Sequence, residues 1–201
     1  MGLFDSIKKA VAGSSGSGNS IGKAVSGAAS AINSVKKNKT VEVSFPKLPE
    51  TLEEFKAMPQ ASLTDPFNVA ALVVVALTFY PKNKELSISM LNFLKGPQPL
   101  NQREIQFLND RFMDKDYVPR SFFGGAVPSN DYTPSVPYTV KVSDNPYSYE
   151  SQGYAKLFLF SGGADSERPV QLRSAKDGKW YLWEQFLLSD IRPPESSNPW
   201  A

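Results

Sequence analysis

The residues of this sequence best suited to catalysis are carboxylates. The chain contains no histidine and no cysteine, which removes the usual general base, Ser/His triads, thiolate nucleophiles and most transition-metal sites. Glu184 shares a predicted strand face with Leu182 and Phe186, and burial of that face would favour general acid or base chemistry at its carboxyl group. The alternative for Glu184 is an edge ion pair or a solvent-facing side chain. Asp165, in a glycine-rich loop, is the second catalytic candidate.

Five further residues are candidates for ligand binding. Gly162 and Gly163 precede Arg168, and a glycine-rich backbone beside an arginine can form an anion-binding nest. The spacing matches neither a P-loop nor a dinucleotide fingerprint, so we favour the alternative, a plain hairpin connection that uses glycine for positive φ. Arg173 and Trp183 lie on two later predicted strands and complete this group. We expect no metal and no cofactor.

The N-terminus carries a pattern of a different kind. Apolar residues in the first twelve positions fall on one side of a predicted helix and lysines on the other, as in helices that lie on membranes or dock on proteins. A serine- and glycine-rich stretch, 13–20, follows as a flexible linker. The residues predicted to contact a membrane or a partner are Leu3, Phe4, Ile7, Lys8, Lys9 and Val11.

Charge and hydropathy limit the partners and the location. Residues 1–40 hold six lysines and one aspartate, whereas the whole chain has a net charge of only +2, so the remainder is net negative. We therefore expect no nucleic-acid binding. The longest apolar stretch, 67–80, is too short to cross a bilayer core of about 30 Å, and no signal peptide is recognisable. These features predict a cytoplasmic protein, with peripheral contact to the inner face of the membrane through residues 1–12 as one alternative.

The elements that must position these residues follow from periodicity and capping signals. A short strand at 41–45 precedes helices at 51–58, 67–80, 83–95 and 101–112, each opened by a Thr, Asp or Asn cap. Strands are expected at 138–142, 154–160, 170–174 and 179–187, the last two joined by a two-residue turn at Asp177-Gly178. The order predicts an α+β fold, with three to four helices packed on one face of a curved antiparallel sheet of about four strands. Predicted boundaries are an N-terminal segment at 1–40, the domain at 41–194 and a tail at 195–201.

Several sequence segments together resemble a bacterial domain family of unknown function. They are SLTDPFNVAAL (62–72), MLNFLKGPQPL (90–100), NDYTPSVPYTV (130–140), GYAKLFLFSGGADSERPVQLR (153–173) and WYLWEQFLLSDIRPP (180–194). The resemblance covers about residues 62–201 and implies a shared fold and a bacterial cytoplasmic origin, but no catalytic residues. The closing strand, turn and tryptophan-bearing strand are also similar to cystatin-like folds, which include the NTF2-like proteins.

These features favour a non-enzymatic interaction or scaffold protein. Its domain would bind a protein partner or form a homo-oligomer, and its N-terminal segment would tether it to a membrane surface or an assembly. The alternative is a small-molecule-binding protein or carboxylate-dependent enzyme that uses a pocket between helices and sheet. An immunity or antagonist protein would also lack catalytic residues.

Overall fold

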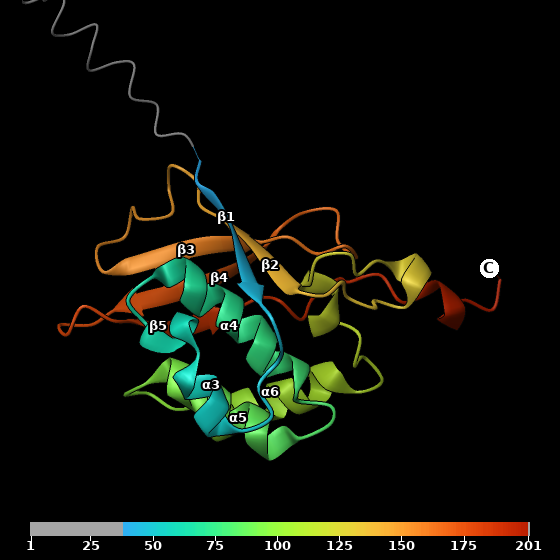
Figure 1. The fold of residues 1–201 in the computed structure, drawn as a ribbon, viewed down its shortest axis with the longest axis horizontal. Coiled ribbons are helices and arrows are strands. Elements are labelled where there is room, and N and C mark those ends of the chain that lie inside the picture. The colour runs from blue at the N-terminus through green and yellow to red at the C-terminus, as the bar shows by residue number, and fades with distance from the viewer. Residues whose placement is uncertain (1–37, 201) are drawn as a thin grey trace, which may run out of the picture. The chain divides into compact units, whose positions relative to one another are not determined.

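The computed structural model describes residues 38–200, which fold as an α+β domain. Within them, four α-helices precede most of a five-stranded antiparallel sheet (Figure 1). The helices are α3 (Leu52–Ala57), α4 (Pro66–Thr78), α5 (Lys84–Lys95) and α6 (Gln102–Phe112). The strands are β1 (Thr40–Phe45), β2 (Tyr138–Ser143), β3 (Tyr154–Leu159), β4 (Arg168–Ser174) and β5 (Trp180–Gln185). The α+β class and the four helices agree with the sequence prediction.

The strands lie in sequence order, β1-β2-β3-β4-β5, although the helices separate β1 from β2 in the chain. The sequence predicts about four strands, and the structure has five because β1 pairs with β2 over its full length, from Thr40 opposite Ser143 to Phe45 opposite Tyr138. The strand alternates as a sheet edge requires, since Val43 and Phe45 are buried while Glu42 and Ser44 are exposed. β1 therefore forms one edge of the sheet, and β5 forms the other.

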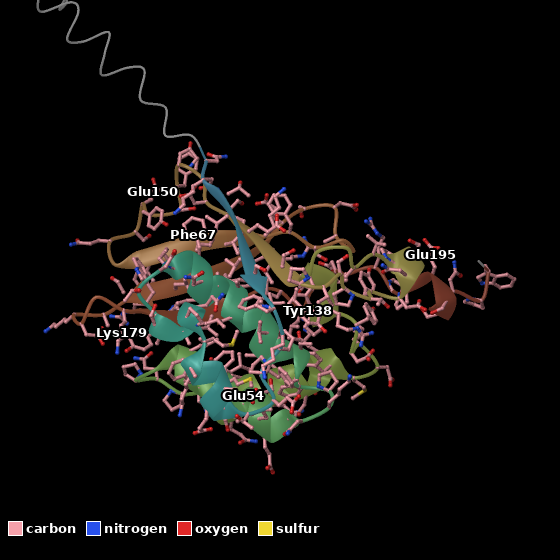
Figure 2. All side chains as sticks on the ribbon, in the orientation of Figure 1. Glu54, Phe67, Tyr138, Glu150, Lys179 and Glu195 are labelled. Carbon is pink, nitrogen blue, oxygen red and sulfur yellow. The ribbon has the colours of Figure 1, made fainter. Side chains whose placement is uncertain are left out.

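Helix α4 is the centre of the core. Its start is fixed by Asp65, whose carboxylate accepts from the Phe67 amide at 2.9 Å, and by Pro66 in the first turn. Every residue in 69–77 has no exposed surface, so valines that are mediocre helix formers are held in place by burial on all sides. In Figure 1, α4 lies against the sheet, and α3, α5 and α6 lie beyond it. Side chains fill the space between these layers, including Phe67, which is 3% exposed (Figure 2).

The following helices begin where their caps predict. Asn83 accepts from the Leu86 amide at 3.1 Å, and Asn101 forms a full capping box with Glu104. The buried Ser87 hydroxyl of α5 donates to the Ala76 carbonyl of α4 at 2.7 Å, which fixes the two helices against each other without an unsatisfied polar group.

The β4–β5 hairpin differs in detail from the prediction. The Gly178 amide donates to the Ala175 carbonyl, and the Ala175 amide donates to the Lys179 carbonyl, which encloses a three-residue loop rather than a two-residue turn. Gly178 has φ of 79°, the conformation expected for the last residue of such a loop. The hairpin and its glycine were therefore predictable, but the loop length was not.

Gly96 ends α5 for two separate reasons. Its backbone has φ of 58° and ψ of −117°, a combination that L-residues avoid. A Cβ atom at this position would also overlap the ring of Tyr181 on β5. The chain can therefore leave α5 and pass the edge of the sheet only because residue 96 has no side chain.

We predict that Gly96→Ala destabilises the domain by about 2–5 kcal/mol, since it combines backbone strain of about 1–2 kcal/mol with steric overlap of about 1–3 kcal/mol. Gly178→Ala is the matched control, because that glycine also has positive φ, at 79°, but a Cβ there would meet nothing within 4 Å. Urea unfolding of both variants separates the two effects. Equal losses at the two positions would show that the contact with Tyr181 contributes nothing.

Candidate functional site

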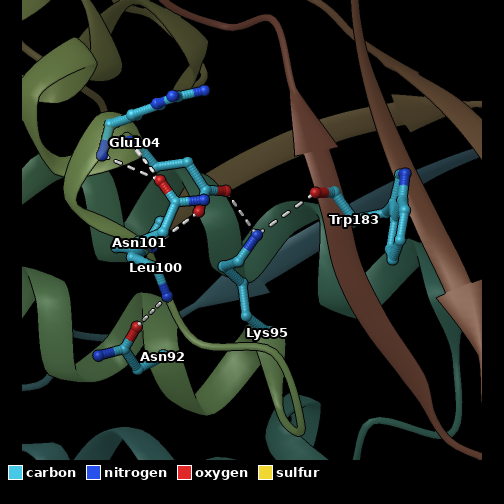
Figure 3. A network of polar contacts seen from close by, with 7 residues as sticks. Asn92, Lys95, Leu100, Asn101, Glu104 and Trp183 are labelled. Atoms are coloured by element: carbon cyan, nitrogen blue, oxygen red, sulfur yellow. Dashed lines mark hydrogen bonds and ion pairs between the residues drawn. The ribbon is translucent and has the colours of Figure 1, made fainter.

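A β-bulge interrupts β5 at Trp183. Leu172 pairs with Leu182 and Gln171 pairs with Glu184, so Trp183 is the extra residue between two registered pairs. A bulge breaks the alternation of side chains and turns a backbone group away from the ladder. Here the Trp183 carbonyl points toward α5 while its indole ring lies on the other side of the strand (Figure 3).

Lys95, in the last turn of α5, occupies the space in front of this carbonyl. Its side chain is only 8% exposed, and its ammonium group donates to Glu104 Oε1 at 2.8 Å and approaches the Trp183 carbonyl at 3.5 Å (Figure 3). A buried ammonium requires such partners, because an uncompensated charge in the interior is strongly destabilising. We call these three residues the Lys95 network. It joins α5, α6 and β5.

The corner between α5 and α6 is fixed by the same carboxylate. Glu104 Oε2 accepts from the Asn101 amide at 2.8 Å, and Asn101 Oδ1 accepts from the Glu104 amide at 3.0 Å. Asn92 of α5 accepts from the Leu100 amide at 2.8 Å. Both oxygens of Glu104 are therefore used, one by the helix cap and one by Lys95.

An apolar cleft opens on one side of the Lys95 network. Its volume is about 260 Å³ and it lies between α4, α5, α6 and β5. Phe107 and Phe186 are 41% and 48% exposed. The polar side chains in its lining come from Lys95, Glu104, Glu184 and Gln185. Its apolar lining consists of Leu77, Leu91, Leu100, Phe107, Leu108, Leu182 and Phe186, with Trp183 between them.

A second cavity, of about 350 Å³, shares Lys95, Leu182 and Trp183 with the first, and we call it the Arg173 pocket. The end of the β4–β5 hairpin and the turn after α5 form its walls. Tyr181 lines it, and burial together with the nearby Asp177 carboxylate raises the pKa of the Tyr181 hydroxyl. That hydroxyl donates to Asp177 at 3.3 Å.

Arg173 and Trp183, two predicted ligand-binding residues, are brought together here. The Arg173 guanidinium lies 5.0 Å from the centre of the Trp183 ring and 5.6 Å from that of Tyr154. The two rings meet edge to face with centres 5.8 Å apart. Cation–π contacts of this kind hold the guanidinium in one orientation.

The two catalytic candidates lie in different places. Glu184 is exposed and lines the apolar cleft. The bulge at Trp183 puts it out of phase with Leu182, so the burial expected from simple alternation does not occur. The side chain of Asp165 is 91% exposed, and it pairs with Arg192 rather than lining either cavity. The structure does not bring Glu184 and Asp165 together.

The two glycines of the β3–β4 connection are needed for space rather than for positive φ. A Cβ on Gly162 would overlap the Ala126 carbonyl, and one on Gly163 would overlap the Tyr132 hydroxyl. Neither glycine has positive φ, which corrects the conformational reason expected for a hairpin. Their amides donate to the Ser121 carbonyl and to Ser161 Oγ, so packing accounts for both residues without a ligand.

Arg168 connects the β3–β4 connection to the segment that follows β5. Its guanidinium donates to the carbonyls of Ser166, Ser189 and Asp190 at 2.8–3.0 Å. These bonds tie the β3–β4 connection to the chain that follows β5. Its donors are therefore directed at the protein itself, in contrast to those of Arg173.

Sequence reasoning missed Lys95, Glu104 and Phe107. The capping box identified Glu104 as a helix-start residue, but nothing local indicates that its second oxygen meets Lys95. Phe107 lies on the exposed side of α6, where an aromatic residue on an otherwise polar face was the available signal. The predicted N-terminal contacts, from Leu3 to Val11, lie outside the described residues.

The family of the chain is identified by one comparison. A family model described as Domain of unknown function (DUF6935) matches residues 47–195. The chain belongs to this family. The match begins before α3 and so extends further toward the N-terminus than the resemblance found in the sequence. No curated protein and no solved structure matches the chain. The likeness to cystatin-like folds is therefore limited to the general arrangement of helices against an antiparallel sheet.

Two structural findings concern the DUF6935 domain as a whole. Among residues 38–200, no helix is both long and apolar enough to cross a membrane. Over the same residues, no group of three or more acidic side chains is arranged to hold a metal ion.

We predict that Glu104→Gln destabilises the domain by about 1–3 kcal/mol, because it keeps the hydrogen bonds of the helix cap but leaves the buried Lys95 charge without a counter-ion. The double variant Lys95→Met with Glu104→Gln should lose less than the single variant. Urea unfolding measures the free energy of unfolding of the single and the double variant.

Glu53→Gln is the control for this experiment. It removes the charge of an exposed pair with Lys56, in which the Glu53 side chain is 80% exposed, and should change stability by less than about 0.5 kcal/mol. If Glu104→Gln and this control have equal free energies of unfolding, the Lys95 network does not contribute to the stability of the domain.

Proposed function

We propose that the chain is a non-enzymatic interaction protein whose DUF6935 domain binds a protein partner through the apolar cleft beside β5. The observation that carries this proposal is the cleft's lining, in which apolar side chains predominate and Phe107 and Phe186 remain largely exposed. Exposed aromatic residues beside a concave apolar surface are typical of the centre of a protein interface.

The polar groups in the cleft support binding rather than catalysis. Lys95 already donates to Glu104 and the Trp183 carbonyl. Glu104 accepts from Lys95 and from the backbone of Asn101. These groups therefore serve to hold the walls of the cleft in place, and a pre-formed surface loses little conformational entropy on binding.

The charge of the cleft favours a particular partner. Lys95 is neutralised by Glu104, which leaves the exposed Glu184 as the unpaired charge in the lining. A partner segment with one large apolar side chain and a neighbouring lysine or arginine would fill the cleft and complement Glu184. We therefore propose a basic, apolar-anchored protein segment as the ligand.

A carboxylate-dependent or small-molecule-binding protein is the second candidate, and the position of Glu184 favours it. Glu184 lies in the lining of the cleft together with Lys95 and Gln185. A carboxylate in a largely apolar cavity can serve as a general base. Loss of a detected activity in a correctly folded Glu184→Gln variant would replace the interaction proposal with this one.

We predict that the full chain selects peptides with an aromatic or large aliphatic residue next to lysine or arginine from a random dodecapeptide phage library. A synthetic peptide of the selected consensus should bind Phe186→Asp at least about tenfold more weakly than the unaltered chain, as expected for an interface anchor worth about 1.4 kcal/mol or more. Isothermal titration calorimetry measures both affinities.

Tyr147→Asp is the matched control, because Tyr147 is 72% exposed and does not line the cleft. It should bind the peptide with unchanged affinity. Selection without a consensus, or equal affinity for the Phe186→Asp variant, would contradict the proposed binding site.

We also propose that residues 2–12 attach the protein to the inner face of a membrane or to an assembly. The support is their sequence pattern, in which Leu3, Phe4 and Ile7 share one helical side and Lys8 and Lys9 lie on the other. Each lysine near an anionic surface contributes about 1 kcal/mol to membrane binding.

The full chain should sediment with anionic liposomes, whereas a shortened chain that begins at Thr40 should remain in the supernatant. Leu3→Asp with Ile7→Asp should abolish sedimentation, because it removes the apolar contact. Ser14→Asp with Ser15→Asp introduces the same charge in the linker and should weaken sedimentation less. Equal sedimentation of all chains would contradict a membrane role for residues 2–12.

A further inference from the structure

We propose that the Arg173 pocket binds a small organic anion, a carboxylate or phosphate carried by a flat apolar ring. This site is separate from the apolar cleft and goes beyond the proposed protein interaction. It is built by the end of the β4–β5 hairpin, the Trp183 bulge and the turn that follows α5.

Arg173 is the residue that would bind the oxyanion. Its guanidinium lies beside both the Trp183 and the Tyr154 ring, 5.0 and 5.6 Å from their centres. Within residues 38–200 it takes part in no ion pair and no hydrogen bond, whereas Arg120, Arg168 and Arg192 all donate to acceptors of the protein. An exposed guanidinium beside two aromatic rings, whose N–H groups have no acceptor among residues 38–200, is available to bind a carboxylate or phosphate in a bidentate manner.

The charges around the pocket favour an anion. Lys176 also lines it, and no carboxylate does. The nearest acidic residue in the hairpin, Asp177, accepts from the Tyr181 hydroxyl and lies 3.8 Å from the Lys179 ammonium. Arg173 and Lys176 therefore present two positive charges that no described residue neutralises.

The remaining walls suit a flat apolar group. Tyr181, Trp183, Pro97 and Leu182 line the cavity. The volume of about 350 Å³ lies at the lower end of the range for small-molecule sites. A single or fused ring with one anionic substituent matches this size, and its ring would pack against the aromatic walls while its oxyanion meets Arg173.

The pocket is also pre-formed. Gly96 lets the turn after α5 approach Tyr181, since any side chain at this position would overlap that ring. Lys95 fixes the bulge from the opposite side through the Trp183 carbonyl. The walls on both sides are therefore positioned by contacts that are independent of a ligand, which reduces the entropy lost on binding.

The test uses the full chain and three probes, which are indole-3-acetate, its neutral analogue indole-3-acetamide, and phenyl phosphate. Binding is measured by calorimetry and by the NMR signal of the Arg173 Nε–H group. We expect at least one anionic probe to bind and shift this signal, and the neutral analogue to bind at least about tenfold more weakly, because charge-assisted bonds are about twice as strong as neutral ones. If indole-3-acetate binds with the higher affinity, the ligand is assigned as a carboxylate. If phenyl phosphate binds with the higher affinity, the ligand is assigned as a phosphate.

Variants locate the site. Arg173→Gln should abolish binding, and Arg173→Lys should retain only part of it, because lysine cannot form the planar bidentate contact. Arg103→Gln is the control, since Arg103 is an exposed arginine of α6 that lines neither cavity. Phe186→Asp, which disrupts the apolar cleft, should leave anion binding unchanged, so failure of the protein interaction and failure of this site can be told apart.

Equal binding of indole-3-acetate and indole-3-acetamide would overturn the proposal, because it would show that the charge is not recognised. Anion binding that survives in Arg173→Gln would also overturn it, by placing the anion elsewhere. Absence of binding by both anions, measured up to millimolar concentration, would have the same consequence.

Discussion

A buried ammonium group holds the two halves of the candidate site together. The Lys95 side chain is 8% exposed, and its ammonium group donates to Glu104 and to the Trp183 carbonyl. Each partner is supplied by a different feature, since Glu104 belongs to a helix cap and the Trp183 carbonyl is turned outward by a bulge. The α5 helix, the α6 helix and the β5 strand are thereby fixed relative to one another.

This constraint explains why two cavities of opposite character lie side by side. On one side of Lys95, Leu91 of α5 and Phe107 and Leu108 of α6 line the cleft with residues of β5, and Glu104 neutralises the lysine. On the other side, the bulge presents the Trp183 ring to Arg173, which has no acidic partner among the described residues. One surface is therefore suited to an apolar side chain of a protein, and the other to a small anion. Lys95, which pairs with Glu104, lines both cavities.

The elements of the fold were predictable because their signals are local. Asp65, Asn83 and Asn101 begin helices where their capping positions indicate. The unbroken apolar run at 69–77 correctly predicted a helix buried on all sides. β1 was visible as a short strand, but its place in the sheet depends on β2, about a hundred residues later, which no local pattern shows.

The site was less predictable because it depends on contacts distant in sequence. Alternation along β5 predicted that Glu184 is buried beside Leu182, but the bulge at Trp183 lies between them, and Glu184 lines the same cleft as an exposed residue. Arg173 and Trp183 were recognised from residue type, but the space between them and Pro97 exists only because Gly96 passes close to Tyr181. The pairing of Lys95 with Glu104 joins two helices around a turn, and periodicity cannot show which charged residues meet there.

Amide hydrogen exchange of the full chain and of Lys95→Met tests the central role of the Lys95 network most directly. Methionine keeps most of the side-chain volume and removes the charge, so it breaks the contacts with Glu104 and the Trp183 carbonyl without opening a large cavity. If the network holds the site together, α6 and β5 should lose protection together while β1 and β2 remain protected. Unchanged protection of α6 and β5 would contradict the account and show that apolar packing alone positions the two cavities.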